Sequence, residues 1–172
     1  MTKPWQPSGE WAGETVAVLA SGQNMSVEVA DALRHHRTIA VNFAIRAAPW
    51  ADMLVALDGN WPQELRDFEG IRVTGIVDDT LDALYVGMVY ETVIFDSGEV
   101  VTFRNSGLHA IRVAAAMGAS RIILAGFNPL HPGHFYDDEV DTGEYVGVYH
   151  GLQKITAELT ARGIKVETYE AD

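Results

Sequence analysis

Residues 128–139 hold the side chains of this sequence that are best suited to proton transfer. His131 and His134 stand there, followed by acidic residues at positions 137–139. Because imidazole exchanges protons near neutral pH, His134 or His131 could act as a general base, with Asp137 as a third catalytic candidate. The same side chains could bind a divalent metal, or the acids could form a solvated loop tip. His-x-x-His on a loop lacks the helical i,i+4 spacing of zinc proteases, so we expect no metal site here.

Small polar residues follow the apolar run at positions 15–20. Gly22 allows a sharp turn, and the backbone N–H groups that follow could face a ligand. The turn matches neither the GxGxxG fingerprint nor a Walker motif, so an ordinary strand-to-helix turn explains it equally well. The candidate ligand-binding residues of this turn are Ser21, Gly22, Gln23 and Asn24.

Further polar groups stand where apolar runs end and where a helix begins. Asn42 and Asp58 each follow such a run. They could contact a base or a ribose hydroxyl, or only close a turn by bonding to nearby backbone. At the start of the most strongly patterned helix, Ser106 suits the N-cap, and the helix dipole favours a phosphate or carboxylate beside Gly107. Capping alone would also explain Ser106. The other candidate ligand contacts are Asn105, Asn128 and Tyr136.

Composition excludes several classes of protein. The chain has 172 residues, 48% of them hydrophobic, which suits one globular domain. A net charge of −12 argues against binding to nucleic acid or to anionic membranes, but not against a nucleotide held by backbone N–H groups. The absence of cysteine excludes disulfides, thiolate metal sites and thiol nucleophiles. Because no stretch resembles a signal peptide or a membrane span, we expect a cytoplasmic protein.

Short apolar runs alternate with helical patterns along the chain. The pattern predicts strands at 15–20, 38–41, 53–57, 71–74, 121–125 and 164–168, helices at 26–36, 106–117 and 145–162, and a hairpin from 92–95 and 100–103. This order predicts an α/β fold that is Rossmann-like and doubly wound, with a mainly parallel sheet, helices on both faces and an inserted β-hairpin. We expect residues 1–13 to form an irregular arm and residues 14–172 to form one nucleotide-binding domain. Ligands of such sheets bind beyond the carboxyl ends of the strands, at the topological switch point.

Several segments carry a resemblance to known proteins. They are VLASGQNM at 18–25, IAVNFA at 39–44, APWAD at 48–52, NSGLHAI at 105–111, MGASRIILAGF at 117–127 and HFYD at 134–137. With these segments the chain resembles a group of small phage and prophage proteins of unassigned function. It is also similar to the nucleotide-binding half of bacterial sialyltransferases that use CMP-sialic acid, and to pterin-pyrophosphokinase-like domains. The resemblance spans residues 16–138.

The resemblance implies a nucleotide or nucleotide-sugar ligand, with Mg²⁺ or Mn²⁺ left open as a cofactor. It implies that residues 21–24 line the phosphate and sugar, that Asn42 contacts the base or ribose, and that Ser106 and Gly107 meet the phosphate. Residues 131–137 would then cover the reacting group, with His134 as the base. A phage-encoded protein would act in the host cytoplasm.

Three functions remain open from the sequence. The first is a transferase that uses a nucleotide-activated donor, in the manner of the sialyltransferases. The second is a non-catalytic module that binds or sequesters a nucleotide-like small molecule; the ASGQN turn at 20–24, where sialyltransferases have GxGPS, favours it. The third is a structural or assembly protein that uses the Trp-containing arm or the hairpin. Each is compatible with a homo-oligomer.

Overall fold

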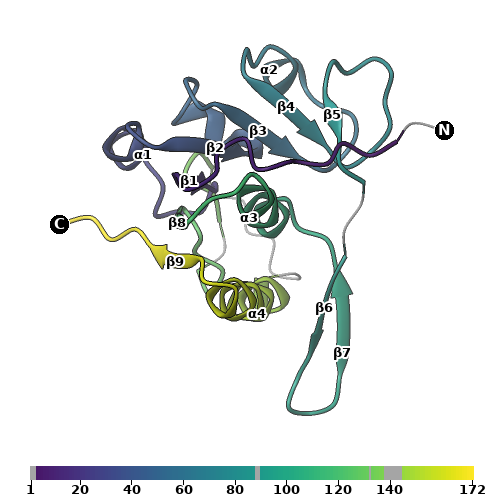
Figure 1. The fold of residues 1–172 in the computed structure, drawn as a ribbon, viewed down its shortest axis with the longest axis vertical. Coiled ribbons are helices and arrows are strands. Elements are labelled where there is room, and N and C mark those ends of the chain that lie inside the picture. Colours follow the sequence, from purple (N-terminus) through teal and green to yellow (C-terminus); the bar gives the residue numbers. More distant parts are fainter. Residues whose placement is uncertain (1–2, 88–89, 132, 138–144) are drawn as a thin grey trace.

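A seven-stranded parallel sheet forms the centre of the molecule (Figure 1). The computed structural model describes residues 3–87, 90–131, 133–137 and 145–172. The strands lie in the order β5-β4-β3-β2-β1-β8-β9. They are β1 (Thr15–Leu19), β2 (Arg37–Val41), β3 (Met53–Ala56), β4 (Ile71–Thr74), β5 (Leu84–Tyr85), β8 (Arg121–Ala125) and β9 (Lys165–Thr168). The predicted parallel sheet is therefore confirmed.

Helices cover both faces of this sheet, which is why its central strands are apolar at nearly every position. Val16 and Val18 of β1 pack in one cluster with α3 (Ser106–Ala116) and α4 (Tyr145–Ala161). The alternate residues Ala17 and Leu19 pack on the other face, with α1 (Val27–Leu33), the 3-10 helix η1 (Asn42–Arg46) and α2 (Gln63–Arg66). The doubly wound, Rossmann-like arrangement is confirmed.

The chain changes direction across the sheet at β1. From β1 it passes through α1 to β2 on one side, whereas α3, on the opposite face, leads into β8 on the other side. Connections that leave in opposite directions open a crevice beyond the carboxyl ends of the two central strands. The ends of β1 and β8 are therefore the topological switch point of this sheet.

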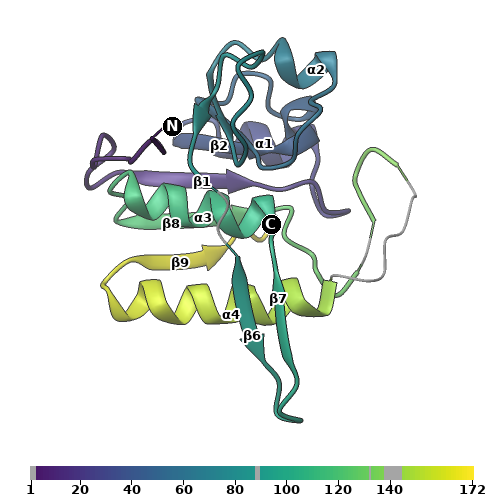
Figure 2. The same ribbon diagram turned by 90° about the vertical axis from the view of Figure 1, so that its right-hand side faces the viewer.

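The predicted hairpin is a separate two-stranded antiparallel sheet, formed by β6 (Glu91–Ile94) and β7 (Val100–Phe103). Figure 2 shows it running beside α4 and extending beyond the rest of the molecule. Its inner residues Val93 and Phe103 are buried in the cluster with α3 and α4, whereas Ile94 and Val100 on its outer face are exposed. The hairpin is therefore attached to the domain through one face only.

Some element boundaries differ from the prediction. The helix predicted to run to residue 36 ends at Leu33, because the N–H of His36 donates to the Leu33 carbonyl and the chain turns into β2. The sequence pattern did not predict α2 or β5, which are four and two residues long. Elements this short leave no periodic signal. In the structure, β4 pairs with β5 on its outer side, and β5 forms this edge of the sheet.

The N-terminal residues pack along the sheet. Trp11 is buried, and its backbone N–H donates to the carbonyl of Met117. The backbone N–H of Trp5 donates to the carbonyl of Tyr85. Both indole rings join the cluster on the α3 and α4 face. Within the residues that the structure describes, no helix is long and apolar enough to cross a membrane.

Candidate functional site

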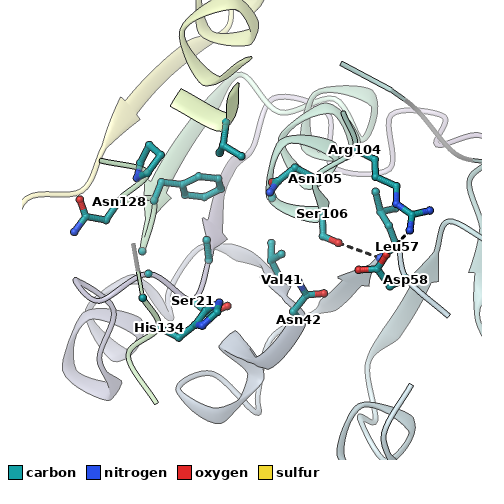
Figure 3. A pocket seen from close by; sticks show the side chains of 18 residues that line it. Ser21, Val41, Asn42, Leu57, Asp58, Arg104, Asn105, Ser106, Asn128 and His134 are labelled. Atoms are coloured by element: carbon teal, nitrogen blue, oxygen red, sulfur yellow. Dashed lines mark hydrogen bonds and ion pairs between the residues drawn. The ribbon is translucent and has the colours of Figure 1, made fainter. Parts of the chain in front are cut away.

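A cavity of about 380 Å³ opens at the switch point, beyond the carboxyl ends of β1, β2, β3 and β8 and beside the first turn of α3 (Figure 3). Its volume falls within the range of about 300–1,000 Å³ that is common for ligand sites. The sequence-predicted residues that line it are Ser21, Gly22, Asn42, Asp58, Asn105, Ser106, Gly107, Asn128 and His134. Gln23, Asn24, His131, Tyr136 and Asp137 are outside the lining.

The turn after β1 is pressed against the turn after β8. The N–H of Gly22 donates to the carbonyl of Gly126 at 2.8 Å, so this N–H is engaged within the protein rather than directed at a ligand. A Cβ on Gly22 would lie 2.4 Å from the same carbonyl oxygen. Gln23 and Asn24 are exposed. The glycine therefore serves close packing of two backbones, and Ser21 is the side chain of this turn that reaches the cavity.

The first turn of α3 forms the opposite wall. Asn105, not Ser106, is the N-cap: its side chain accepts the N–H of Leu108 at 3.1 Å. The prediction that Ser106 caps the helix is wrong, because its hydroxyl oxygen instead accepts the N–H of Leu57 at the end of β3, also at 3.1 Å. The backbone N–H groups of Ser106 and Gly107 have no acceptor within the helix, because they belong to its first turn. They stand at the positive end of the helix dipole. This wall can hold an anion.

Replacement of Ser106 by alanine is expected to lower stability by about 1–3 kcal/mol, because it leaves the N–H of Leu57 without an acceptor in a buried position. Urea unfolding measures the loss. Ser120→Ala is the matched control, since that exposed hydroxyl donates to the carbonyl of Gly13, and its loss should cost less than about 0.5 kcal/mol. Equal effects of the two substitutions would contradict a structural role for the Ser106 hydroxyl.

The polar wall of the cavity contains an arginine that the sequence reasoning missed. Nη2 of Arg104 lies 3.2 Å from Oδ1 of Asp58, and both side chains are largely exposed, at 48% and 69% (Figure 3). An exposed pair of this kind contributes at most about 1 kcal/mol, so Asp58 can turn to a ligand at low cost. Arg104 directly precedes the cap residue Asn105, and this adjacency was the only available signal.

Asn42 completes the polar wall, where β2 passes into η1. Its backbone is left-handed, with φ of +50°, a conformation that Asn tolerates better than most residues. The lining also includes apolar side chains, among them Phe127 and Val148. A Cβ on Gly107 would lie 3.0 Å from the Phe127 ring, so this glycine lets the ring approach the helix start. The cavity lining thus combines polar and apolar side chains.

The predicted histidine loop reaches the cavity through one of its two histidines. His134 forms a backbone bridge with Gly22, and the N–H of Phe135 donates to the Ser21 carbonyl at 3.1 Å, which holds the loop on the turn after β1. His131 is exposed and outside the lining. Asp138 and Glu139, which belonged to the predicted acidic group, lie outside the described residues.

His134 itself stands beside the two other residues predicted from this loop. Its Nδ1 lies 3.5 Å from Oδ1 of Asp137, longer than a normal hydrogen bond, and its ring stacks on Tyr136 with centroids 5.0 Å apart. About a third of the side chain is exposed. An imidazole at the rim of a cavity, with a carboxylate near Nδ1, has the arrangement of a general base. Hydrogen bonds of such groups are often long before a ligand binds and shorten in the complex.

Other titratable groups are separate from the cavity. His109 on α3 is buried, and burial lowers its pKa, so it is neutral at physiological pH. In the described part of the chain neither of its ring nitrogens has a hydrogen-bond partner. Across the same described residues, His, Asp and Glu form no group of three or more that could hold a metal.

Comparison of the chain with protein-family models, with curated proteins and with solved structures gives no match.

Proposed function

We propose that this protein binds a nucleotide-like ligand in the switch-point cavity, with the ligand's phosphate against the first turn of α3. The observation that carries the proposal is the meeting of two anion-binding features at one wall: the N–H groups of Ser106 and Gly107, and the guanidinium of Arg104. They stand at the place where ligands bind in doubly wound sheets.

The rest of the lining suits a nucleoside. Phe127 and Val148 offer an apolar surface for a base or sugar ring. The Asn42 amide and the Asp58 carboxylate can bond to base edges and ribose hydroxyls. The resemblance to CMP-sialic-acid sialyltransferases and to pterin-pyrophosphokinase-like domains points to the same ligand class and remains a prediction.

Thermal-shift screening followed by calorimetry tests this proposal. The panel consists of nucleoside mono- and diphosphates and nucleotide sugars, CMP-sialic acid among them, with and without Mg²⁺ or Mn²⁺. A ligand at a hundred times its Kd should stabilise the fold by about 2.7 kcal/mol. Arg104→Gln should weaken binding about tenfold or more, as expected for a charge-assisted contact to phosphate, whereas Arg162→Gln at the far end of α4 should not. No binding across the panel would refute the proposal.

Group transfer is the second candidate function, and the position of His134 beside Asp137 favours it. His134 would take the proton of an acceptor hydroxyl as the acceptor oxygen attacks the donor carbon. The bond from that carbon to the phosphate oxygen would break, and the leaving phosphate would accept hydrogen bonds from the N–H groups at the start of α3. If the protein catalyses group transfer, His134→Ala should reduce turnover about 10²–10⁴-fold, with a far smaller change in Kd. Tight binding with no turnover in the wild type would favour the non-catalytic module.

A further inference from the structure

The loop that carries His134 is held on η1 by a stack of side chains. The stack starts at His134, which lines the cavity, and its other members lie outside the lining. The His134 ring lies nearly parallel to the Tyr136 ring, at an interplanar angle of 12°. On Tyr136 lies the guanidinium of Arg46, 4.7 Å from the ring centroid, and the same guanidinium lies 4.6 Å from the ring of Phe43. Phe43 also meets Tyr136 edge-on at 5.5 Å.

Arg46 is itself held in a fixed orientation. Its Nε and Nη2 donate to the two carboxylate oxygens of Glu64 on α2, at 2.7 and 2.8 Å. Such a two-pronged pair fixes the plane of the guanidinium, which a lysine ammonium could not do. The hydrogen bonds that Arg46 donates to Glu64, with the nearby Tyr136 and Asp137, raise the pKa of Arg46. The pair with Glu64 therefore holds the guanidinium carbon of Arg46 over the Tyr136 ring.

We propose that Arg46 is a positioning residue for His134: held by Glu64, it clamps Tyr136 and thereby keeps the His134 loop closed against the switch-point cavity. Arg46 is outside the cavity lining, so it acts through Tyr136 and not on the ligand. The helix that carries it begins at Asn42, which lines the cavity. One short element thus supplies a wall of the cavity and the fastening of its histidine loop.

The inference rests on the proposed function for the role of His134, but the clamp can be measured without a ligand. Two reporters are available: the ring-proton resonances of His134, which the stacked Tyr136 ring shifts upfield, and hydrogen exchange of the Phe135 amide, which bonds to the Ser21 carbonyl. Arg46→Gln and Glu64→Gln should move the His134 resonances toward those of an unstacked histidine. Both should speed Phe135 exchange about fivefold, equivalent to about 1 kcal/mol for an exposed cation–π contact.

Matched variants separate the clamp from general loosening of the fold. Tyr136→Ala removes the stacked ring and should change both reporters. Arg34→Gln removes a comparable cation–π contact, to Trp50 at 5.0 Å, at the amino edge of the sheet, and should leave them unchanged. The inference is overturned if Arg46→Gln leaves the resonances and the exchange rate at their wild-type values.

Titration with CMP tests the effect on the cavity. Arg46→Gln should raise the Kd for CMP about fivefold, in proportion to the exchange effect, although Arg46 does not touch the cavity. An unchanged Kd in a variant whose loop is released would overturn the positioning role. If the wild type binds no member of the nucleotide panel, the proposed function fails, while the two ligand-free reporters still decide whether Arg46 holds the loop.

Discussion

Replacement of Gly126 by alanine should destabilise the protein by about 3–5 kcal/mol, the largest effect that we expect from any single methyl group added to the chain. Gly126 has φ of +74°, which strains any L side chain. A Cβ there would lie 2.1 Å from the carbonyl oxygen of Ala20, which is backbone and cannot turn aside. The turns after β1 and β8 would be forced apart, so ligand binding in the cavity should be lost as well.

Gly163→Ala is the matched control for this prediction. Gly163 follows α4 with φ of +84°, but a Cβ there would meet no atom within 4 Å. Its substitution should therefore cost only the left-handed strain of about 1–2 kcal/mol. Chemical denaturation of the two variants separates conformational strain from the backbone clash. Losses of the same size would show that the close approach of β1 and β8 does not limit stability.

Replacement of Glu91 by glutamine should cost about 2–4 kcal/mol, because it removes the buried carboxylate that pairs with the Arg112 cation under the hairpin. The side chain of Glu91 is 5% exposed, and its two oxygens accept hydrogen bonds from Nε and Nη2 of Arg112. Arg112 also reaches Glu158 on α4, at 3.2 Å. The pair therefore joins β6 to α3 and α4, and its loss should release the hairpin before the sheet unfolds.

The pH dependence of stability gives an independent check on this pair. The hydrogen bonds from Arg112 lower the pKa of Glu91, so its contribution is complete above the ordinary carboxyl pKa of about 4.5 and is lost as the pH falls through the lower, folded-state value. The stability difference between wild type and Glu91→Gln should be constant from pH 8 to about pH 5 and shrink below that. Glu14→Gln, at an exposed pair with Arg37, should cost about 1 kcal/mol or less. A Glu91→Gln loss of that small size would contradict the buried bridge.

The sequence alone predicted those parts of the fold that depend on the types of residues close together in the chain. Runs such as 16–19 and 122–125 are apolar on both alternating faces, which is typical of a strand buried between two helical layers. Ser26 is the cap of α1, where its hydroxyl accepts the N–H of Val29, and such a cap can be predicted from sequence because it depends on the next three residues only. Parallel strands then bring their carboxyl ends to one edge, so a cluster of Ser21, Asn42 and Ser106 at that edge followed from topology.

The sequence could not predict which hydrogen-bond and packing partners meet when these partners are distant along the chain. Ser106 and Asn105 are equally good caps by type, and only the arrival of the Leu57 N–H, 49 positions away, decided that Ser106 turns to β3. In the same way, His131 and His134 are chemically identical in the sequence. The N–H of Phe135 donates to the Ser21 carbonyl, and this contact holds His134 at the cavity, whereas His131 lies outside it. Residue types and spacing thus determined the sheet and the edge where the site lies, whereas long-range hydrogen bonds and ring contacts, which depend on the packed backbone, decided which side chains face the cavity.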